Sequence, residues 1–294
     1  MRIILSILLL SVCYPDILHV PDDYDTIQEA IDASQDSDTV LVAQGIYYEN
    51  LIIEKSITLT SNAIYDDLTE WVEYSSTFGE YQILNDNILN TIINGSNDTN
   101  GEDLQSTILI YASEGECIDP IIFGFTITGG DGTLVPHEEE DIEEMRGGGV
   151  LSYNALPILN YNFITDNNSP DLENGGGVNA SHGDQFERLL NTENTNYSQP
   201  RCEGDIDLSY NFYRDNDALY GNTLATVGFA GTLDMTSSIF DVYNCPEEEV
   251  TPVWVDVEED VEVDFQYSAG DLCSITEDVW VSPDGDDYLN TGTS

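Results

Sequence analysis

Basic residues are scarce in this sequence. Six Lys and Arg stand against 57 Asp and Glu in 294 residues, which gives a formal net charge of -51 at pH 7. This argues strongly against nucleic acid and anionic membranes as partners, because phosphate groups are bound by Lys and Arg. Solubility in salty surroundings explains such acidity, since salt screens self-repulsion beyond about 8 Å. A coat of divalent cations, which carboxylates bind, is the alternative explanation.

Long apolar runs are also lacking, apart from one at the N-terminus. Arg2 is followed by IILSILLLSV, which is too short to span a bilayer. One positive charge before such a run is typical of a secretory signal, which we place at residues 1–16. LLSVC resembles a lipoprotein box, but Val12 stands where that signal has a small residue. The sequence therefore predicts a secreted or cell-surface protein with no membrane span in the mature chain.

Cysteines are few, and none has the spacing of metal ligands. Removal of the signal would leave four: Cys117, Cys202, Cys245 and Cys273. An even number in an exported protein permits disulfides, and four cysteines allow three connectivities.

Segments with helical periodicity are almost absent, which argues against a doubly wound α/β fold. The one convincing short helix is DTIQEAIDA, Asp25 to Ala33. Thr26 and Glu29 form a capping box at its start, and its apolar residues lie on one stripe.

What the chain does contain is repeats. LNYNFITDN (159–167) returns as LSYNFYRDN (208–216), and PIIFGFTITGG (120–130) aligns without a gap on PILNYNFITDN (157–167). Self-similarity at this spacing is typical of a solenoid, in which each repeat buries its apolar side only against its neighbours. A propeller or sandwich is the structural alternative, but single-strand repeats favour the solenoid.

Equivalent residues of successive coils lie about 4.8 Å apart in a solenoid, so like stacks on like. The alignment predicts that Phe163 stacks on Phe212 and Tyr161 on Tyr210, or that each pair faces across an intervening coil. Phe125 is displaced by one position from this register.

Asn162 and Asn211 predict a ladder of side-chain amides that satisfies buried turn groups. The triple glycines at Gly147–Gly149 and Gly175–Gly177 predict turns with positive φ.

Several segments interrupt the repeats. Ile64 to Tyr81 is interpreted as an excursion, and Gln82 to Gly95 as a further coil strand. HEEEDIEEMR (137–146) is interpreted as a solvated loop, and Gln185 to Gly204 as a second long excursion. Insertions in solenoids tend to emerge on one face, which is often the binding face.

The pattern changes after the last recognisable coil, Gly231 to Asn244. VWVDV and VEVDF, within residues 245–276, alternate apolar and acidic residues. This predicts a half-exposed strand or hairpin, which we expect to form a β-hairpin-like cap at the C-terminal end of the solenoid.

The start of the chain resembles the right-handed parallel β-helix, or pectin-lyase-like, superfamily. The resemblance rests on DYDTIQEAIDA, GIYYENLII and SITLT, between Asp23 and Thr60. It implies an all-β fold, a right-handed parallel β-helix over residues 17–244 whose open end is capped by the short helix. Residues 277–294 contain VSPDGDD and GTS and look like the opening of a further domain of the same broad superfamily. We therefore expect the chain to be part of a longer polypeptide. The alternative is that these residues are an acidic tail.

The superfamily includes polysaccharide lyases, polygalacturonase-type hydrolases and pectin methylesterases, but their catalytic sets have no counterpart here. SHGD (181–184) resembles the polygalacturonase histidine motif without its aspartate pair and basic segment. The remaining catalytic candidates are Arg214, Asp215, Asp166 and His182. Arg214 is more simply interpreted as half of a surface ion pair.

Asp284, Asp286 and Asp287 offer oxygen ligands compatible with Ca²⁺, although no glutamate follows to complete an EF-hand. Ca²⁺ is the one cofactor the sequence suggests. We therefore expect a non-catalytic β-helix module of a larger extracellular protein, used for adhesion or polysaccharide binding. The alternatives are a Ca²⁺-dependent lyase or glycoside hydrolase, and a purely structural spacer.

Overall fold

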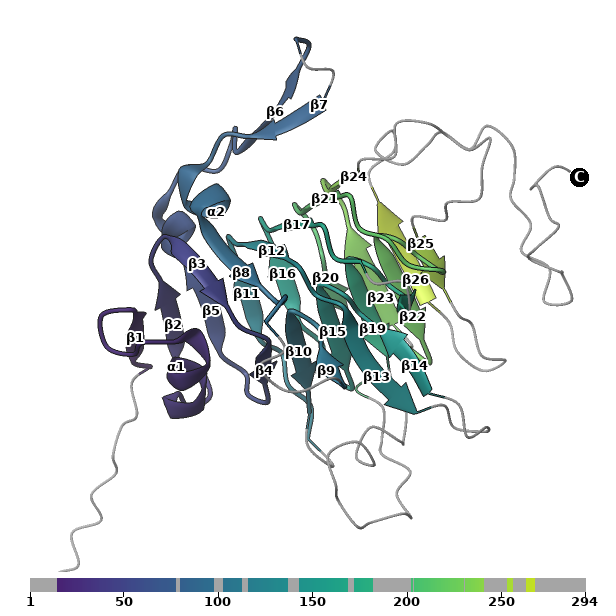
Figure 1. Cartoon of the computed structure of the whole chain (residues 1–294), viewed down its shortest axis with the longest axis horizontal. Coiled ribbons are helices and arrows are strands. Elements are labelled where there is room, and N and C mark those ends of the chain that lie inside the picture. Colours follow the sequence, from purple (N-terminus) through teal and green to yellow (C-terminus); the bar gives the residue numbers. More distant parts are fainter. Residues whose placement is uncertain are drawn as a thin grey trace, which may run out of the picture.

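The computed structural model describes residues 15–77, 80–97, 103–112, 116–136, 143–168, 172–181, 202, 204–229, 231–240, 253–255 and 263–267. Three long sheets run side by side along the molecule (Figure 1). Sheet A contains β1 (Ile17–Val20), β2 (Thr39–Val42), β5 (Thr58–Ser61), β11 (Ile121–Phe123), β16 (Ile158–Asn160), β20 (Ile206–Asp207), β23 (Gly231–Met235) and β26 (Val263–Tyr267). Sheet B contains β3 (Gly45–Tyr48), β8 (Thr91–Asn94), β12 (Thr126–Thr128), β17 (Phe163–Thr165), β21 (Phe212–Arg214) and β24 (Ile239–Phe240). Sheet C contains β4 (Leu51–Ile53), β10 (Ile108–Tyr111), β15 (Val150–Tyr153), β19 (Val178–Ser181), β22 (Leu224–Val227) and β25 (Val253–Val255).

The chain visits the three sheets in turn, and each strand pairs in parallel with the equivalent strands of neighbouring coils. In one coil, Leu159 of sheet A, Ile164 of sheet B and Val178 of sheet C all point into a common apolar core. No helix layer covers these sheets in the described part of the chain, so each coil shields its neighbours. The fold is a parallel β-helix, as the sequence predicts.

Helix α1 (Ile27–Ala33) closes the N-terminal end. Its buried residues Ile27, Ala30 and Ile31 belong to the same core as the strands. Thr26 is the N-cap, and its hydroxyl accepts a hydrogen bond from the Glu29 amide at 3.1 Å, which confirms the predicted helix start.

The predicted stacks are confirmed between adjacent coils. Tyr161 and Tyr210 stack with ring centroids 5.1 Å apart, and Phe163 and Phe212 do so at 5.1 Å. Phe125 is displaced because Thr126, not Phe125, pairs with Phe163. One position along a strand reverses the face, so Phe125 points into the core and is fully buried.

Two asparagine ladders fill the turns of the coils. Asn162 donates to Oδ1 of Asn211 at 3.1 Å, as predicted, and Asn167 donates to Oδ1 of Asn216 at 3.0 Å in a second ladder that the sequence analysis did not include. Of the triple glycines, only the first of each set has positive φ, 62° at Gly147 and 73° at Gly175.

Four elements between β5 and β8 lie outside the coils. A short helical turn η1 (Asn62–Tyr65) and the antiparallel hairpin β6 (Val72–Ser75) and β7 (Glu80–Ile83) form the predicted excursion, which projects from the N-terminal half in Figure 1. Helix α2 (Asp86–Asn90) follows it. The predicted coil strand over residues 82–95 is thus confirmed only for β8, because its first half forms the hairpin end and α2.

A fourth, smaller sheet, here called the insertion sheet, contains β9 (Leu104–Gln105), β13 (Gly132–Pro136), β14 (Glu143–Arg146) and β18 (Leu172–Asn174). Its Val135 packs with Leu109, Leu151 and Tyr153 from the outer face of sheet C. The interpretation of residues 137–146 as a solvated loop is wrong for β14, since pairing with β13 and β18 orders this acidic segment as a strand.

The predicted C-terminal strands exist, but they do not form a hairpin. β25 pairs in parallel with β22 in sheet C, and β26 pairs in parallel with β23 in sheet A. They are the last strands of sheets C and A in the described part of the chain, and a closing role for this segment remains a prediction. Alternation of apolar and acidic residues indicates a strand with one apolar and one polar face. It does not indicate which other strand that strand pairs with.

Cys117 and Cys202 form a disulfide, which selects one pairing among those the sequence left open. Three predictions lie outside the described residues: the pairing of Cys245 and Cys273, the further domain at 277–294, and most of the signal at residues 1–16. Of that signal, only Pro15 and Asp16 are described. Within the described residues, no helix is long and apolar enough to cross a bilayer.

Candidate functional site

The outer face of sheet B presents one side chain per coil along a line, here called the sheet B row: Tyr48, Asn94, Thr128, Thr165 and Arg214. Tyr48 pairs with Asn94, Asn94 with Thr128, and Thr165 with Arg214. The pairing of Ile127 with Ile164 places Thr128 beside Thr165. Because neighbouring strands are about 4.8 Å apart, the row is a ladder of hydroxyl, amide and guanidinium groups at regular spacing along the solenoid axis.

Most members of the row are open to solvent. Tyr48 is 52% exposed, and Asn94, Thr128 and Arg214 are partly exposed. Thr165 is buried, and its hydroxyl donates to Oδ2 of Asp166 at 3.0 Å.

In the later coils, the parallel row two positions earlier on the same strands is covered instead, whereas Ile46 at the other end of that row is 57% exposed. Phe163 and Phe212 pack with Trp71 and Tyr81 in a second apolar cluster. Tyr81 on β7 lies edge-on to Phe212, with ring centroids 6.2 Å apart, so one strand of the hairpin contacts this part of sheet B. Trp71 meets Tyr161 edge-on at 5.8 Å, while Tyr210 at the outer end of that stack remains 42% exposed. Trp71 and the hairpin thus cover Phe163 and Phe212, while most of the sheet B row beside them is open to solvent.

Arg214 joins the two rows. Its guanidinium carbon lies 4.8 Å from the ring centre of Phe163 and 5.6 Å from that of Phe212, within the range of cation–π attraction. Its Nε lies 3.5 Å from Oδ2 of Asp215, close enough for an ion pair but without a hydrogen bond. The surface ion pair interpreted from the sequence is therefore present, and the rings hold the guanidinium plane in place.

The structure gathers three of the four catalytic candidates at one corner of the coil. Asp166 and Asp215 occupy equivalent turn positions in adjacent coils, with φ of 53° and 55°, and the Asp166 amide donates to the Arg214 carbonyl at 3.3 Å. Both carboxylates are exposed at this turn, so nothing in this geometry encloses them away from water. His182 lies outside the described residues, and a catalytic role for the four remains a prediction.

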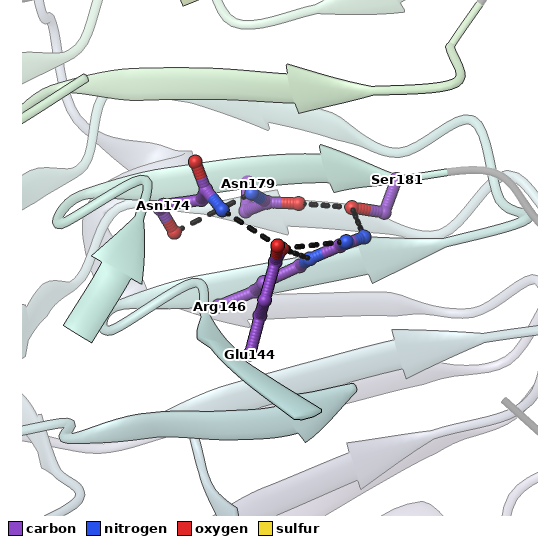
Figure 2. A network of polar contacts seen from close by, with 5 residues as sticks. All are labelled: Glu144, Arg146, Asn174, Asn179 and Ser181. Carbon is purple, nitrogen blue, oxygen red and sulfur yellow. Dashed lines mark hydrogen bonds and ion pairs between the residues drawn. The ribbon is translucent and has the colours of Figure 1, made fainter. Parts of the chain in front are cut away.

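A second polar cluster centres on a buried arginine, Arg146, at the end of β14 (Figure 2). Its Nε and Nη2 both donate to Oε2 of Glu144, at 3.1 and 2.8 Å, and its Nη1 donates to the Ser181 hydroxyl at 3.3 Å. The side chain of Arg146 is only 5% exposed and that of Glu144 19%.

Sheet C and β18 complete this network. Asn174 donates to Oε2 of Glu144 at 3.1 Å, and the Ser181 hydroxyl donates to Oδ1 of Asn179. Figure 2 shows the Arg146 guanidinium between Glu144 and Ser181, with hydrogen bonds to both side chains. The cluster fastens the insertion sheet to the outer face of sheet C, and the burial of Arg146 keeps it from reaching a ligand in solution.

Metal ligands do not gather in the described residues: no group of three His, Cys, Asp or Glu side chains is arranged to hold an ion there. Asp284, Asp286 and Asp287 lie outside those residues, so the Ca²⁺ site remains a prediction.

Of the sheet B row, only Arg214 was predicted as a site residue. Tyr48, Asn94 and Thr128 each end a sheet B strand, at the position that Thr165 and Arg214 occupy in the recognisable repeats. The available signal was this strand-end position. This signal was hidden for Tyr48 and Asn94, because the first coils differ too much from the later ones to align with them, whereas Thr128 aligns with Thr165 in the repeats.

No protein-family model matches the chain, and no curated protein matches it. Among solved structures, the chain is similar to the crystal structure of a pectin methylesterase from Aspergillus niger, with a TM-score of 0.31 and 13% sequence identity. The match covers 88% of this chain and 69% of that one. A similarity of this size carries no argument about activity or ligand, and the assignment of the chain as a parallel β-helix rests on its own sheet pairing.

Proposed function

We propose that this chain is a non-catalytic module of an exported protein that binds polysaccharide along the outer face of sheet B. The observation that carries the proposal is the sheet B row, in which four of five successive coils offer an exposed or partly exposed polar or aromatic side chain. Ligand sites combine apolar or aromatic side chains with a few polar groups that fix the ligand's orientation. The row provides both kinds of surface, because the ring of Tyr48 lies beside the amide of Asn94 and the guanidinium of Arg214 is planar.

A repeating ligand suits a repeating surface. A sugar ring has apolar faces and a rim of hydroxyls, so it can lie against an aromatic ring or a guanidinium plane and donate to amide or hydroxyl oxygens. A polymer that runs along the solenoid axis would meet a further side chain at most of the coils it crosses, and linked weak contacts add to a useful affinity.

Export is supported by chemistry as well as by the N-terminal pattern. The Cys117–Cys202 disulfide is of the kind that forms and persists in oxidising surroundings. It supports the expected secreted or cell-surface location together with the signal that we place at residues 1–16.

Binding is favoured over catalysis by the surroundings of Arg214. A lyase needs a base beside the substrate, whereas this guanidinium lies over Phe163 and beside Asp215.

The test is a binding assay against immobilised plant, algal and bacterial polysaccharides, with the wild-type chain and the Tyr48→Ala and Asn94→Ala variants. We expect at least one polysaccharide to be retained and both variants to lose about ten-fold or more in affinity, roughly the size of one lost contact of 1.4 kcal/mol. Tyr65→Ala is the matched control, since Tyr65 is 70% exposed and lies outside the row.

Two outcomes would contradict the proposal. Retention of no polysaccharide would leave the structural spacer. Release of unsaturated or reducing sugars from a retained polymer, lost in Arg214→Ala or Asp215→Asn, would instead support a lyase or a hydrolase.

A further inference from the structure

The charge around the sheet B row restricts what can lie on it. The whole chain carries a formal net charge of -51. Asp166 and Asp215 both stand exposed at the corner where the row ends in the later coils. An anionic polymer approaching this surface would be repelled at low salt, since a surface of one sign disfavours ligands of the same sign.

The one base in the row does not reverse this. Arg214 has its charge next to the carboxylate of Asp215 and over the two phenylalanine rings. A ligand would therefore meet a planar guanidinium whose charge is already partly compensated.

The other described bases are occupied elsewhere. Nζ of Lys55 donates to the carbonyls of Ile31, Asp32 and Ser34, at 2.9, 2.9 and 2.8 Å. Arg146 is buried against Glu144. Among the described residues, therefore, none of the three Lys and Arg side chains offers an uncompensated positive charge to a bound polyanion.

We propose that the ligand of the sheet B row is an uncharged polysaccharide, laid along the solenoid axis, and that Arg214 contacts it as a flat hydrogen-bond donor and not as a counter-ion. This rests on the function proposed above and names the class of polymer. Tyr48 at one end and Arg214 at the other provide planar surfaces for sugar rings, and Asn94 and Thr128 between them provide hydrogen-bonding groups for hydroxyls. None of these contacts requires a charge on the polymer.

Salt dependence separates the two kinds of ligand. Affinity electrophoresis or calorimetry would compare neutral polymers (amylose, mannan, a β-glucan and xylan) with polygalacturonate and alginate, at about 50 and about 500 mM NaCl. For a bound neutral polymer we expect the dissociation constant to change less than about three-fold with salt, and the anionic polymers to bind at least about 100-fold more weakly at the lower salt. Parallel runs with added CaCl₂ and with a chelator test whether cations bridge the acidic surface to an anionic polymer.

Arg214→Lys gives a second, independent readout. It keeps the positive charge and removes the plane, so we expect about ten-fold weaker binding of the neutral polymer, with Tyr48→Ala showing a comparable loss. Thermal unfolding of each variant checks that it is folded. Because Tyr48 is an exposed side chain, its truncation keeps the test valid even if Arg214→Lys destabilises the sheet.

The outcomes are distinct. Binding of polygalacturonate or alginate in preference to every neutral polymer, with or without Ca²⁺, would overturn the inference and leave the polysaccharide-binding function standing. Equal binding of Arg214→Lys and wild type to the neutral polymer would overturn the role given to the guanidinium plane. Binding of no polymer would overturn both the inference and the proposed function.

Discussion

Asn211 holds Asn162 through two hydrogen bonds: its Oδ1 accepts from the backbone amide of Asn162 at 2.9 Å and from the Asn162 side chain at 3.1 Å. Its own Nδ2 donates to the carbonyls of Leu159 and Leu208, both at 2.7 Å. Asn211 and Asn162 are fully buried. One side chain thus satisfies the turn groups of two successive coils, where water cannot do so.

Asn211→Ala should therefore destabilise the solenoid strongly. The substitution leaves the Asn162 amide and two carbonyls without this partner, and each buried polar group left unpaired costs about 1–3 kcal/mol. We expect a loss of roughly 3–5 kcal/mol in urea unfolding followed by circular dichroism. Asn222→Ala is the control, since the Asn222 hydrogen bonds are long, at 3.4 Å, and should cost less than about 0.5 kcal/mol. Similar losses for both variants would contradict the ladder.

The buried ion pair of β14 can be tested by a double-mutant cycle. Glu144→Gln leaves the charge of Arg146 buried against a neutral side chain, which should cost about 3–5 kcal/mol. Arg146→Met removes the charge, and the double variant should lose clearly less than the sum of the two single losses. Additive losses in chemical unfolding would show that the two side chains do not act as a pair.

The N-terminal cap should depend on two ionic side chains from the first coil. The Glu49 carboxylate accepts from the Ile27 and Gln28 amides at 3.0 and 2.9 Å, and Lys55 donates to three carbonyls at the other end of α1. Each charge faces the helix end of opposite partial charge. We expect Lys55→Met to lower stability by about 1–2 kcal/mol.

The change should be local to this end of the solenoid. Amide hydrogen exchange should accelerate in α1 and β1 and remain unchanged in sheet A strands near the C-terminal end. Uniform acceleration throughout the chain would contradict a capping role for Lys55.

The contacts that could be predicted from the sequence are those that repeat from coil to coil. Asn162 and Asn211, like Phe163 and Phe212, lie in two copies of one motif, and stacking at successive coils requires the same residue in the same place. Their pairing could be predicted for that reason. The Asn167–Asn216 ladder carries the same signal, since both residues end the aligned repeats, and it could have been predicted in the same way.

The parts that were missed depend on contacts that do not repeat. β14 is a strand because β13 and β18 pair with it, although its own residues EEMR have the composition of a loop. The sheet B row begins with Tyr48 and Asn94, in coils that do not align with the later ones. Arg214 could be identified as half of an ion pair from its neighbour Asp215, but its position over Phe163 depends on the stacking of a whole coil.

The last prediction concerns alkaline unfolding and Tyr213, an inward-facing residue of β21. Tyr213 is fully buried and stacks on Phe240 with ring centroids 5.6 Å apart. Burial raises the pKa of the Tyr213 phenol well above its usual value near 10, because the apolar core disfavours the charged form. Below pH 10 the phenol is protonated in both the folded and the unfolded chain, so its contribution to stability is complete and independent of pH. Above pH 10 the unfolded chain loses the proton first, and the free energy of unfolding should fall by up to about 1.4 kcal/mol per pH unit from this group.

Tyr213→Phe should remove this part of the decline and leave the stacking on Phe240 in place. The measurement is urea unfolding between about pH 8 and about pH 11.5, where the variant should show a shallower loss of stability than wild type above pH 10. Tyr65→Phe removes an exposed phenol and controls for the loss of a hydroxyl. If Tyr213→Phe and wild type lose stability with the same slope, the phenol is not held in its neutral form by the core, and the inward orientation of Tyr213 would have to be reconsidered.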